Sequence, residues 1–154
     1  KTLNYNARFI QLAGEINTTM PEFVVNKTAE ALNAACKSIR GSRILILGLA
    51  YKKDVDDLRE SPSIELIEMF KHRGAKVDYN DPHIRQTHKQ REHDLKMKSV
   101  SLTAASLKKY DAVVISTDHS AYDYAMIVKN ARLVIDTRNA TAKVRGAKRN
   151  VVKA

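Results

Sequence analysis

Three basic side chains follow strand-like runs of the sequence and could bind phosphate. Lys52 and Lys53 come shortly after the apolar run 44–47, and Arg138 comes directly after the run 133–136. Open α/β sheets bind ligands at the carboxyl ends of their strands. Ammonium groups and a guanidinium that converge on a helix N-terminus suit a phosphate or diphosphate. The alternative is that both lysines are solvated loop charges, paired with the aspartates of the same loop.

The loop after the first run differs from a dinucleotide-binding turn. Such a turn needs glycines so that the backbone can approach a pyrophosphate closely, and Ala50 and Lys53 stand where two of them would be. The pattern G-x-G-x-x-G is absent from the whole sequence. Asp81 lies too far beyond Gly48 to be the acid that usually binds the ribose, so a turn role is expected for it. The sequence therefore predicts no NAD site in this chain.

Other reactive side chains fit structural roles better than catalytic ones. The segment 54–61 holds four carboxylates around Arg59, a pattern that favours a loop braced by internal ion pairs over a metal site. Cys36 lies in a helical pattern with no group nearby to activate it. His119 follows a strand end, where it could contact a ligand or stabilise a turn. Surface positions without metal-ligand spacing are expected for His72, His83, His88 and His93.

These residues need a scaffold, and the sequence alternates strand and helix patterns. Unbroken apolar runs indicate strands buried on both faces, as in parallel sheets. Ser61 and Pro62 predict a helix start, and Gly74 predicts its end. Shorter helices are expected at 102–109 and 122–129. We predict an α/β, Rossmann-like, doubly wound and mainly parallel five-stranded sheet after an N-terminal helical segment. The strands are expected at 44–47, 76–80, near Val100, 112–117 and 133–136, in spatial order third, second, first, fourth, fifth.

The N-terminal segment is predicted to form two helices. Thr19 and Glu22 have the spacing of a capping box, and Pro21 suits a first helical turn. Upstream of them, Phe9, Leu12 and Ile16 form one apolar stripe. This stripe predicts either a dimer interface or packing against the chain's own sheet.

Composition narrows the classes of partner. The chain has 154 residues and a net charge of +10. The last 17 residues hold six of the 27 basic side chains and no acidic one, which leaves 21 basic against 17 acidic residues elsewhere. No nucleic-acid-binding signature accompanies this charge, and no apolar run is long enough to cross a membrane. One cysteine favours a cytoplasmic location. The chain begins without methionine, which suggests a piece of a longer protein.

Several segments resemble the UDP-glucose/GDP-mannose dehydrogenase family, in the family's order and spacing. The longest segment reads Leu-Gly-Leu-Ala-Tyr-Lys-Lys-Asp-Val-Asp-Asp-Leu-Arg-Glu-Ser-Pro. Its sequence looks most like the branch of the family that acts on UDP-N-acetylglucosamine or UDP-N-acetylmannosamine. The matching segments are 8–17, 20–21, 47–62, 79–82, 116–120 and 134–140.

The resemblance implies a function and an organisation. Family members oxidise the C6 alcohol of a UDP-sugar to a carboxylate in two NAD-dependent steps, through a cysteine-bound intermediate, and so supply polysaccharide precursors. They have an NAD-binding domain, a central dimerisation helix and a UDP-binding domain. This chain resembles the last two parts. We therefore expect a helical segment over 1–40, part of the central helix, and a UDP-sugar-binding Rossmann-like domain over 41–154.

Residue roles follow from the same motifs. Tyr51 and Lys52 would contact the UDP-sugar, and Arg138 would reach its diphosphate or sugar; Lys53 and His119 are further candidates. The family's nucleophilic cysteine lies upstream of the matched region and is not Cys36. The isolated chain is thus expected to hold no catalytic, NAD-binding or metal-binding residue and to be inactive alone. The alternative function is a free-standing nucleotide-binding regulatory domain, which the start without methionine disfavours.

Overall fold

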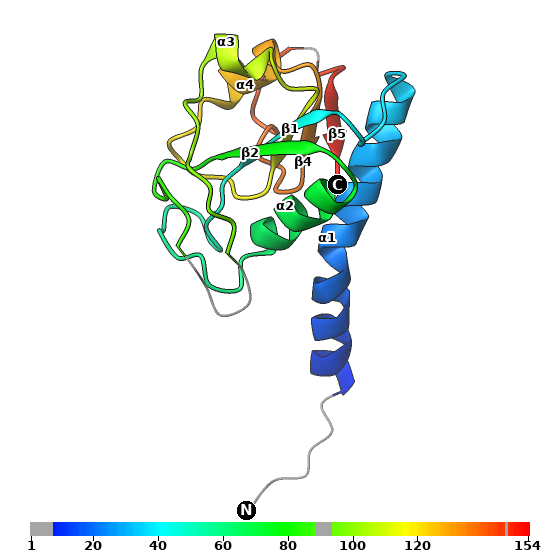
Figure 1. Cartoon of the computed structure of the whole chain (residues 1–154), viewed down its shortest axis with the longest axis vertical. Coiled ribbons are helices and arrows are strands. Elements are labelled where there is room, and N and C mark those ends of the chain that lie inside the picture. The colour runs from blue at the N-terminus through cyan, green and yellow to red at the C-terminus, as the bar shows by residue number, and fades with distance from the viewer. Residues whose placement is uncertain (1–7, 89–93, 147) are drawn as a thin grey trace, which may run out of the picture.

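A five-stranded parallel sheet forms the centre of the molecule (Figure 1). The computed structural model describes residues 8–88, 94–146 and 148–154. The sheet has the order β2-β1-β3-β4-β5, and every neighbouring pair is parallel. The predicted α/β class with a five-stranded parallel sheet is confirmed. The strands are β1 (Arg43–Leu47), β2 (Lys76–Asn80), β3 (Ala112–Ile115), β4 (Val134–Asp136) and β5 (Val151–Lys153).

Helices cover both faces of the sheet and account for its apolar strands. Side chains alternate between the faces of a strand, so Ile44 and Ile46 pack with α1 and α2, whereas Leu45 and Leu47 pack with the core under α3 and α4. All four of these side chains are fully buried. The helices are α1 (Arg8–Ala34), α2 (Pro62–His72), α3 (Ala104–Leu107) and α4 (Tyr124–Asn130).

Two edge assignments made from the sequence were wrong. Residues around Val100 form no strand. The Val100 N–H donates to the Tyr79 carbonyl and the Asn80 amide donates to the Val100 carbonyl, and the bridge nearby, between Gln86 and Lys98, is isolated and antiparallel. The fifth strand is instead β5, beside β4 at the opposite edge. Its three residues are too few to show a period. The predicted order of the inner strands is otherwise confirmed.

A single helix replaces the predicted pair at the N-terminus. α1 is continuous through Pro21, so the capping box at Thr19 and Glu22 was wrong. The Pro21 side chain is buried together with Val24 and Val25, which offsets the missing backbone hydrogen bond. The Thr19 hydroxyl donates to the Ile16 carbonyl within the helix. Burial thus overrides a local helix-start signal here.

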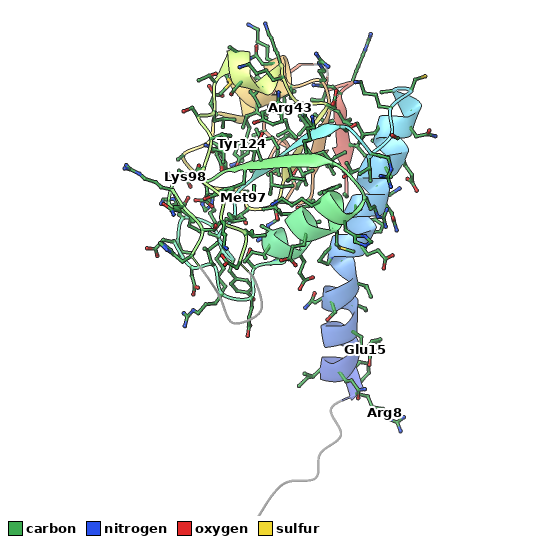
Figure 2. The ribbon with its side chains drawn as sticks, viewed as in Figure 1. Arg8, Glu15, Arg43, Met97, Lys98 and Tyr124 are labelled. Carbon is green, nitrogen blue, oxygen red and sulfur yellow. The ribbon has the colours of Figure 1, made fainter. Side chains whose placement is uncertain are left out.

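The N-terminal turns of α1 extend away from the sheet and its covering helices, and Figure 2 shows Arg8 and Glu15 on this extension. Phe9 is 89% exposed, and Leu12 and Ile16 are each 52% exposed. The predicted packing of this stripe on the chain's own sheet is therefore wrong. Residues 1–7 of the predicted segment lie outside the described ranges.

The start of α2 matches its sequence signal and fixes one wall of the site described below. Ser61 is the N-cap and its side chain accepts from the Ser63 N–H, while Pro62 occupies the first turn. The Ser61 hydroxyl donates to the Leu49 carbonyl at 2.7 Å, and the Ser63 hydroxyl donates to the Gly48 carbonyl at 3.0 Å. These bonds tie the helix start to the end of β1.

Among the described residues, no helix is long and apolar enough to span a membrane.

Candidate functional site

The loops after β1, β3 and β4 meet at the carboxyl edge of the sheet. The strand order reverses between β1 and β3, and this switch point is where open α/β sheets bind ligands. A cavity of about 520 Å³ opens there, with Tyr51 and Arg138 in its lining. The far wall comes from the middle of α1 and the start of α2, through Met20, Pro21 and Pro62. The structure therefore brings two of the predicted ligand residues to one cavity.

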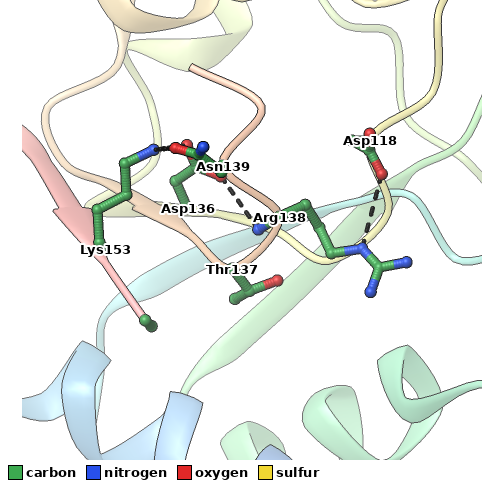
Figure 3. Close-up of a pocket in the computed structure, with 7 residues that line it drawn as sticks. Asp118, Asp136, Thr137, Arg138, Asn139 and Lys153 are labelled. Carbon is green, nitrogen blue, oxygen red and sulfur yellow. Dashed lines mark hydrogen bonds and ion pairs between the residues drawn. The ribbon is translucent and has the colours of Figure 1, made fainter. Parts of the chain in front are cut away.

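Arg138 stands between this cavity and two others. One, of about 700 Å³, lies at the ends of β4 and β5 and is drawn in Figure 3. The other, of about 890 Å³, is lined by the cations Lys53, Lys143 and Arg145 besides Arg138. The Arg138 side chain is 45% exposed, so its guanidinium can reach solvent and ligand. The cavity of about 890 Å³ is therefore basic, whereas the wall of the cavity of Tyr51 and Arg138 also contains Glu60 and Glu65.

The cations of the site share one carboxylate. Asp118 lies between the loops, with its oxygens 3.9 Å from Lys53 Nζ and 3.6 Å from Arg138 Nε (Figure 3). Lys52 Nζ lies 5.4 Å from the centre of the Tyr51 ring, a cation–π distance. Within the described ranges, neither lysine forms a direct ion pair with the aspartates of its own loop. The structure thus gives Lys53 a different partner from the one that the solvated-loop alternative supposed.

The acidic run is braced by an internal ion pair, as predicted. Arg59 donates from Nε and Nη2 to the two oxygens of Asp57, at 3.0 and 2.8 Å. These hydrogen bonds from Arg59 lower the pKa of Asp57 to about 2. The pair holds the far half of the loop that begins at Tyr51.

Asp81 gathers the backbone donors of the loop after β1. Its carboxylate accepts from the N–H groups of Leu49 and Ala50, at 2.6 and 3.0 Å, and from those of His83 and Ile84, at 2.8 and 3.0 Å. The side chain is fully buried. The turn role predicted for Asp81 is confirmed by its bonds with His83 and Ile84. The same carboxylate also binds the loop after β1, through Leu49 and Ala50.

This arrangement does not fit a dinucleotide. In such proteins the backbone N–H groups of the first turn approach a pyrophosphate, whereas here Asp81 occupies those of Leu49 and Ala50. Gly48 has φ +81°, and a Cβ there would lie 2.5 Å from the Thr117 Cβ and carbonyl oxygen. Its missing side chain makes room for the segment that follows β3. The turn after β1 is therefore packed against the protein's own groups.

His119 is buried beneath the loop. Its Nδ1 accepts from the Asp54 N–H at 2.9 Å, and its Nε2 lies 3.1 Å from Asp81 Oδ2. Because Nδ1 accepts, the proton of the neutral ring must sit on Nε2, where it is donated to Asp81. The ring has no exposed surface. Ligand contact by His119 therefore stays a prediction. The alternative, a turn-stabilising histidine, agrees with its hydrogen bonds to Asp54 and Asp81.

One histidine pair comes together although its spacing predicted no metal. Ligand atoms of Asp54, His83 and His119 all lie within 4.8 Å of one another. Both nitrogens of His119 are already hydrogen-bonded, so a metal would have to displace the Asp54 N–H or Asp81. The hydrogen-bonded network therefore fits these groups better than a metal site. His72, His83 and His88 are exposed as predicted, and His93 lies outside the described residues.

Asp136 holds the loop that carries Arg138. Its buried carboxylate accepts from the Arg138 and Thr141 N–H groups, at 3.2 and 2.9 Å, and from Lys153 Nζ at 2.6 Å. Burial alone would raise the pKa of Asp136, but the bonds from Lys153 and Thr141 outweigh it and lower the pKa to about 2. Lys153 lies on β5, the strand that the sequence did not reveal.

Fold and site together define a nucleotide-binding domain, and the family comparison agrees. Residues 45–143 match the UDP binding domain of the UDP-glucose/GDP-mannose dehydrogenase family. The match includes both lysines and Arg138. The chain belongs to this family.

The chain is similar in sequence to named dehydrogenases of archaea and bacteria. The UDP-N-acetyl-D-mannosamine dehydrogenase of Methanococcus maripaludis is 33% identical over 143 residues, which are 87% of this chain and 31% of the relative. The UDP-glucose 6-dehydrogenase of Haloferax volcanii is 30% identical, with 92% of this chain and 32% of the relative covered. The solved UDP-D-ManNAc dehydrogenase of Pyrococcus horikoshii superposes with a TM-score of 0.73 at 27% identity, over 99% of this chain and 34% of that one. The chain spans about a third of the length of these relatives.

Proposed function

We propose that this chain is the UDP-sugar-binding part of an NAD-dependent UDP-sugar 6-dehydrogenase. One observation carries the proposal: Tyr51 and Arg138, from loops 87 positions apart, line the same cavity at the switch point of the sheet. Lys52 and Lys53 adjoin Tyr51 in the chain. A diphosphate placed there would meet the Arg138 guanidinium near the N-terminus of α2, and Lys53 lines the adjoining cavity that Arg138 also borders.

The residues divide the ligand between them in this proposal. The Arg138 guanidinium provides two parallel donors for phosphate oxygens, and Lys52 supplies a mobile point charge. The Tyr51 ring is 46% exposed and offers a face or a hydroxyl to the nucleotide or sugar. Lys53 contributes once phosphate competes for it with Asp118. The substrate class we favour is a UDP-N-acetylhexosamine, because the relatives named above include a UDP-N-acetyl-D-mannosamine dehydrogenase.

The chemistry is assigned to residues outside this sequence. The backbone N–H groups that begin the turn after β1 are bound by Asp81, and Cys36 is an exposed cysteine just beyond α1 that lines none of the cavities described above. We place NAD and the nucleophilic cysteine in the part of the relatives that this chain does not match. The chain alone should then bind the UDP-sugar without reducing NAD, in a cytoplasmic setting.

The exposed stripe of α1 is proposed to be covered in the assembled enzyme. Phe9, Leu12 and Ile16 form an apolar face that the described residues leave open. We assign it to a homodimer contact of the helical segment 1–40, beside a UDP-binding domain over 41–154. Sedimentation of the chain and of an Ile16→Glu variant measures this: a dimer that the variant dissociates supports the assignment, and a monomer at all concentrations contradicts it.

Calorimetric titration with UDP and UDP-N-acetylglucosamine tests the site. We expect saturable binding that Arg138→Ala weakens by roughly 1 to 3 kcal/mol, the cost of losing a charged hydrogen-bonding partner. Arg149→Ala is the matched control, because Arg149 is exposed and lies outside the cavities described above. Equal loss in both variants would show that Arg138 acts only through net charge. No heat with wild type at millimolar ligand would contradict binding by this chain alone.

A further inference from the structure

A polar network beneath the site ties three loops together. At its centre, the buried His119 ring joins the Asp54 N–H, in the loop after β1, to the Asp81 carboxylate at the end of β2. His119 itself belongs to the loop after β3. The ring therefore spans the gap between β2 and β3, with the β1 loop held between them.

The network fixes both ends of a short segment. Asp81 holds the start, through the N–H groups of Leu49 and Ala50, and His119 holds the end, through the N–H of Asp54. Tyr51, Lys52 and Lys53 are the three residues in between. The histidine–aspartate pair therefore fixes both ends of this backbone segment, while the Tyr51 N–H also donates to the Asp57 carbonyl at 2.7 Å.

Asp54 is held in an unusual conformation by the same loop. Its φ of +58° is in the left-handed region, which is unfavourable for a residue with a side chain. The carboxylate accepts from the Ser120 N–H and hydroxyl, both at 2.7 Å. These bonds lower the pKa of Asp54 and direct its charge toward Ser120. Asp54 therefore forms no ion pair with Lys52 or Lys53 within the described residues, and Lys53 lies near Asp118 instead.

We propose that His119 is a positioning residue for the nucleotide-sugar site, whose Nδ1 acceptor holds Asp54 and thereby sets the conformation in which Tyr51 and Lys52 meet the diphosphate. This inference rests on the proposed function. It assigns His119 an indirect role, because the ring has no exposed surface from which to touch a ligand. The acceptor at Nδ1 is the essential feature, and the bond to Asp81 orients it.

Two substitutions separate the two nitrogens. In His119→Asn the amide oxygen can take the place of Nδ1 and accept from Asp54, although the contact with Asp81 is lost. In His119→Gln the longer amide can reach Asp81, but no acceptor remains for Asp54. Both variants lose ring packing in the same buried place, so they are matched for general damage. Urea unfolding of each variant measures that damage.

The expected result is an asymmetry in affinity for UDP. His119→Gln should bind UDP about fivefold more weakly than wild type, the effect of one lost hydrogen bond of average strength. His119→Asn should stay within about threefold. Equal affinities of wild type and His119→Gln, or equal losses in the two variants, would overturn the proposal.

Amide hydrogen exchange of Asp54 gives a readout that needs no ligand. We expect protection of this N–H in wild type and in His119→Asn, and faster exchange in His119→Gln. Equal protection in all three proteins would overturn the claim that His119 holds the loop. If wild type does not bind UDP, the proposed function fails together with the role of His119 toward the ligand, while exchange still decides whether the histidine fixes the loop.

Discussion

Two buried carboxylates support the two flanks of the site, and they do so in different ways. Asp136, at the end of β4, is neutralised by Lys153 and holds the loop of Arg138. Asp81, at the end of β2, has backbone N–H groups and His119 as partners and forms no ion pair with a lysine or arginine in the described part of the chain. One flank depends on charge pairing and the other on hydrogen bonds alone.

The difference bears on ligand binding. A lysine near Asp81 would have neutralised the carboxylate but would also have added a cation beneath the β1 loop. With N–H donors instead, Lys53 is the cation of that loop in the lining of the cavity of about 890 Å³, and Lys52 precedes it in the chain. Asp118 then lies between the flanks and faces both Lys53 and Arg138.

The largest expected effect comes from removing the Asp81 carboxylate. Asp81→Ala would leave four backbone N–H groups and His119 without their acceptor in a buried place, and we expect the free energy of unfolding to fall by roughly 3 to 5 kcal/mol. Urea denaturation checks this. Asp94→Ala is the control, since within the described residues Asp94 is an exposed side chain that pairs with Lys96 at 3.6 Å. A loss below about 1 kcal/mol would mean that water replaces the carboxylate easily.

A pH dependence distinguishes the Asp136 flank. The pKa of Asp136, about 2, lies below the usual value of 3.8. The carboxylate therefore contributes fully to stability above pH 3.8, and this contribution is lost as pH falls toward 2. The shift corresponds to about 2 kcal/mol. Unfolding of wild type and of Asp136→Asn between pH 6 and pH 2 measures it. The difference in stability between the two proteins should shrink with acid, and a constant difference would contradict the role of charge on this flank.

The smallest effect is expected where the flanks meet. Asp118→Asn removes the carboxylate that competes with phosphate for Lys53 and Arg138. Because exposed ion pairs are worth only about 0.2 to 1 kcal/mol, UDP should bind up to about fivefold more tightly. Calorimetry compares this variant with wild type. Weaker binding would show that Asp118 orients the cations and does not compete for them.

The sequence predicted those parts of the fold that depend on burial and local signals. Runs such as 44–47 are apolar throughout because both faces of the strand are covered, and Ser61 with Pro62 marks a helix start through local bonds. β5 was missed because it is short and only partly buried. The helix start predicted at Thr19 and Glu22 was wrong because the burial of Pro21 stabilises a continuous helix. Local residue spacing does not show this effect.

The candidate site divides in the same way. The loops that carry its cations could be predicted because they follow strands, and strand ends converge in a parallel sheet. The ligand contacts of these cations stay a prediction. The supporting groups could not, because His119 and Asp54 are 65 positions apart and the bond between them depends on how two loops pack. Lys153 was likewise hidden, since its partner Asp136 becomes a neighbour only through the pairing of β4 with β5.

The most direct test of the account is amide chemical-shift mapping of this chain with UDP. Binding at the switch point predicts saturable shifts for residues 50–54 and for 116–119 and 137–139, the loops that meet there. Residues 26–33, on the part of α1 that lies outside the cavity of Tyr51 and Arg138, should not move. Shifts confined to the basic segment 143–153, without saturation, would contradict the site and would reduce the charge of this chain to a non-specific attraction for anions.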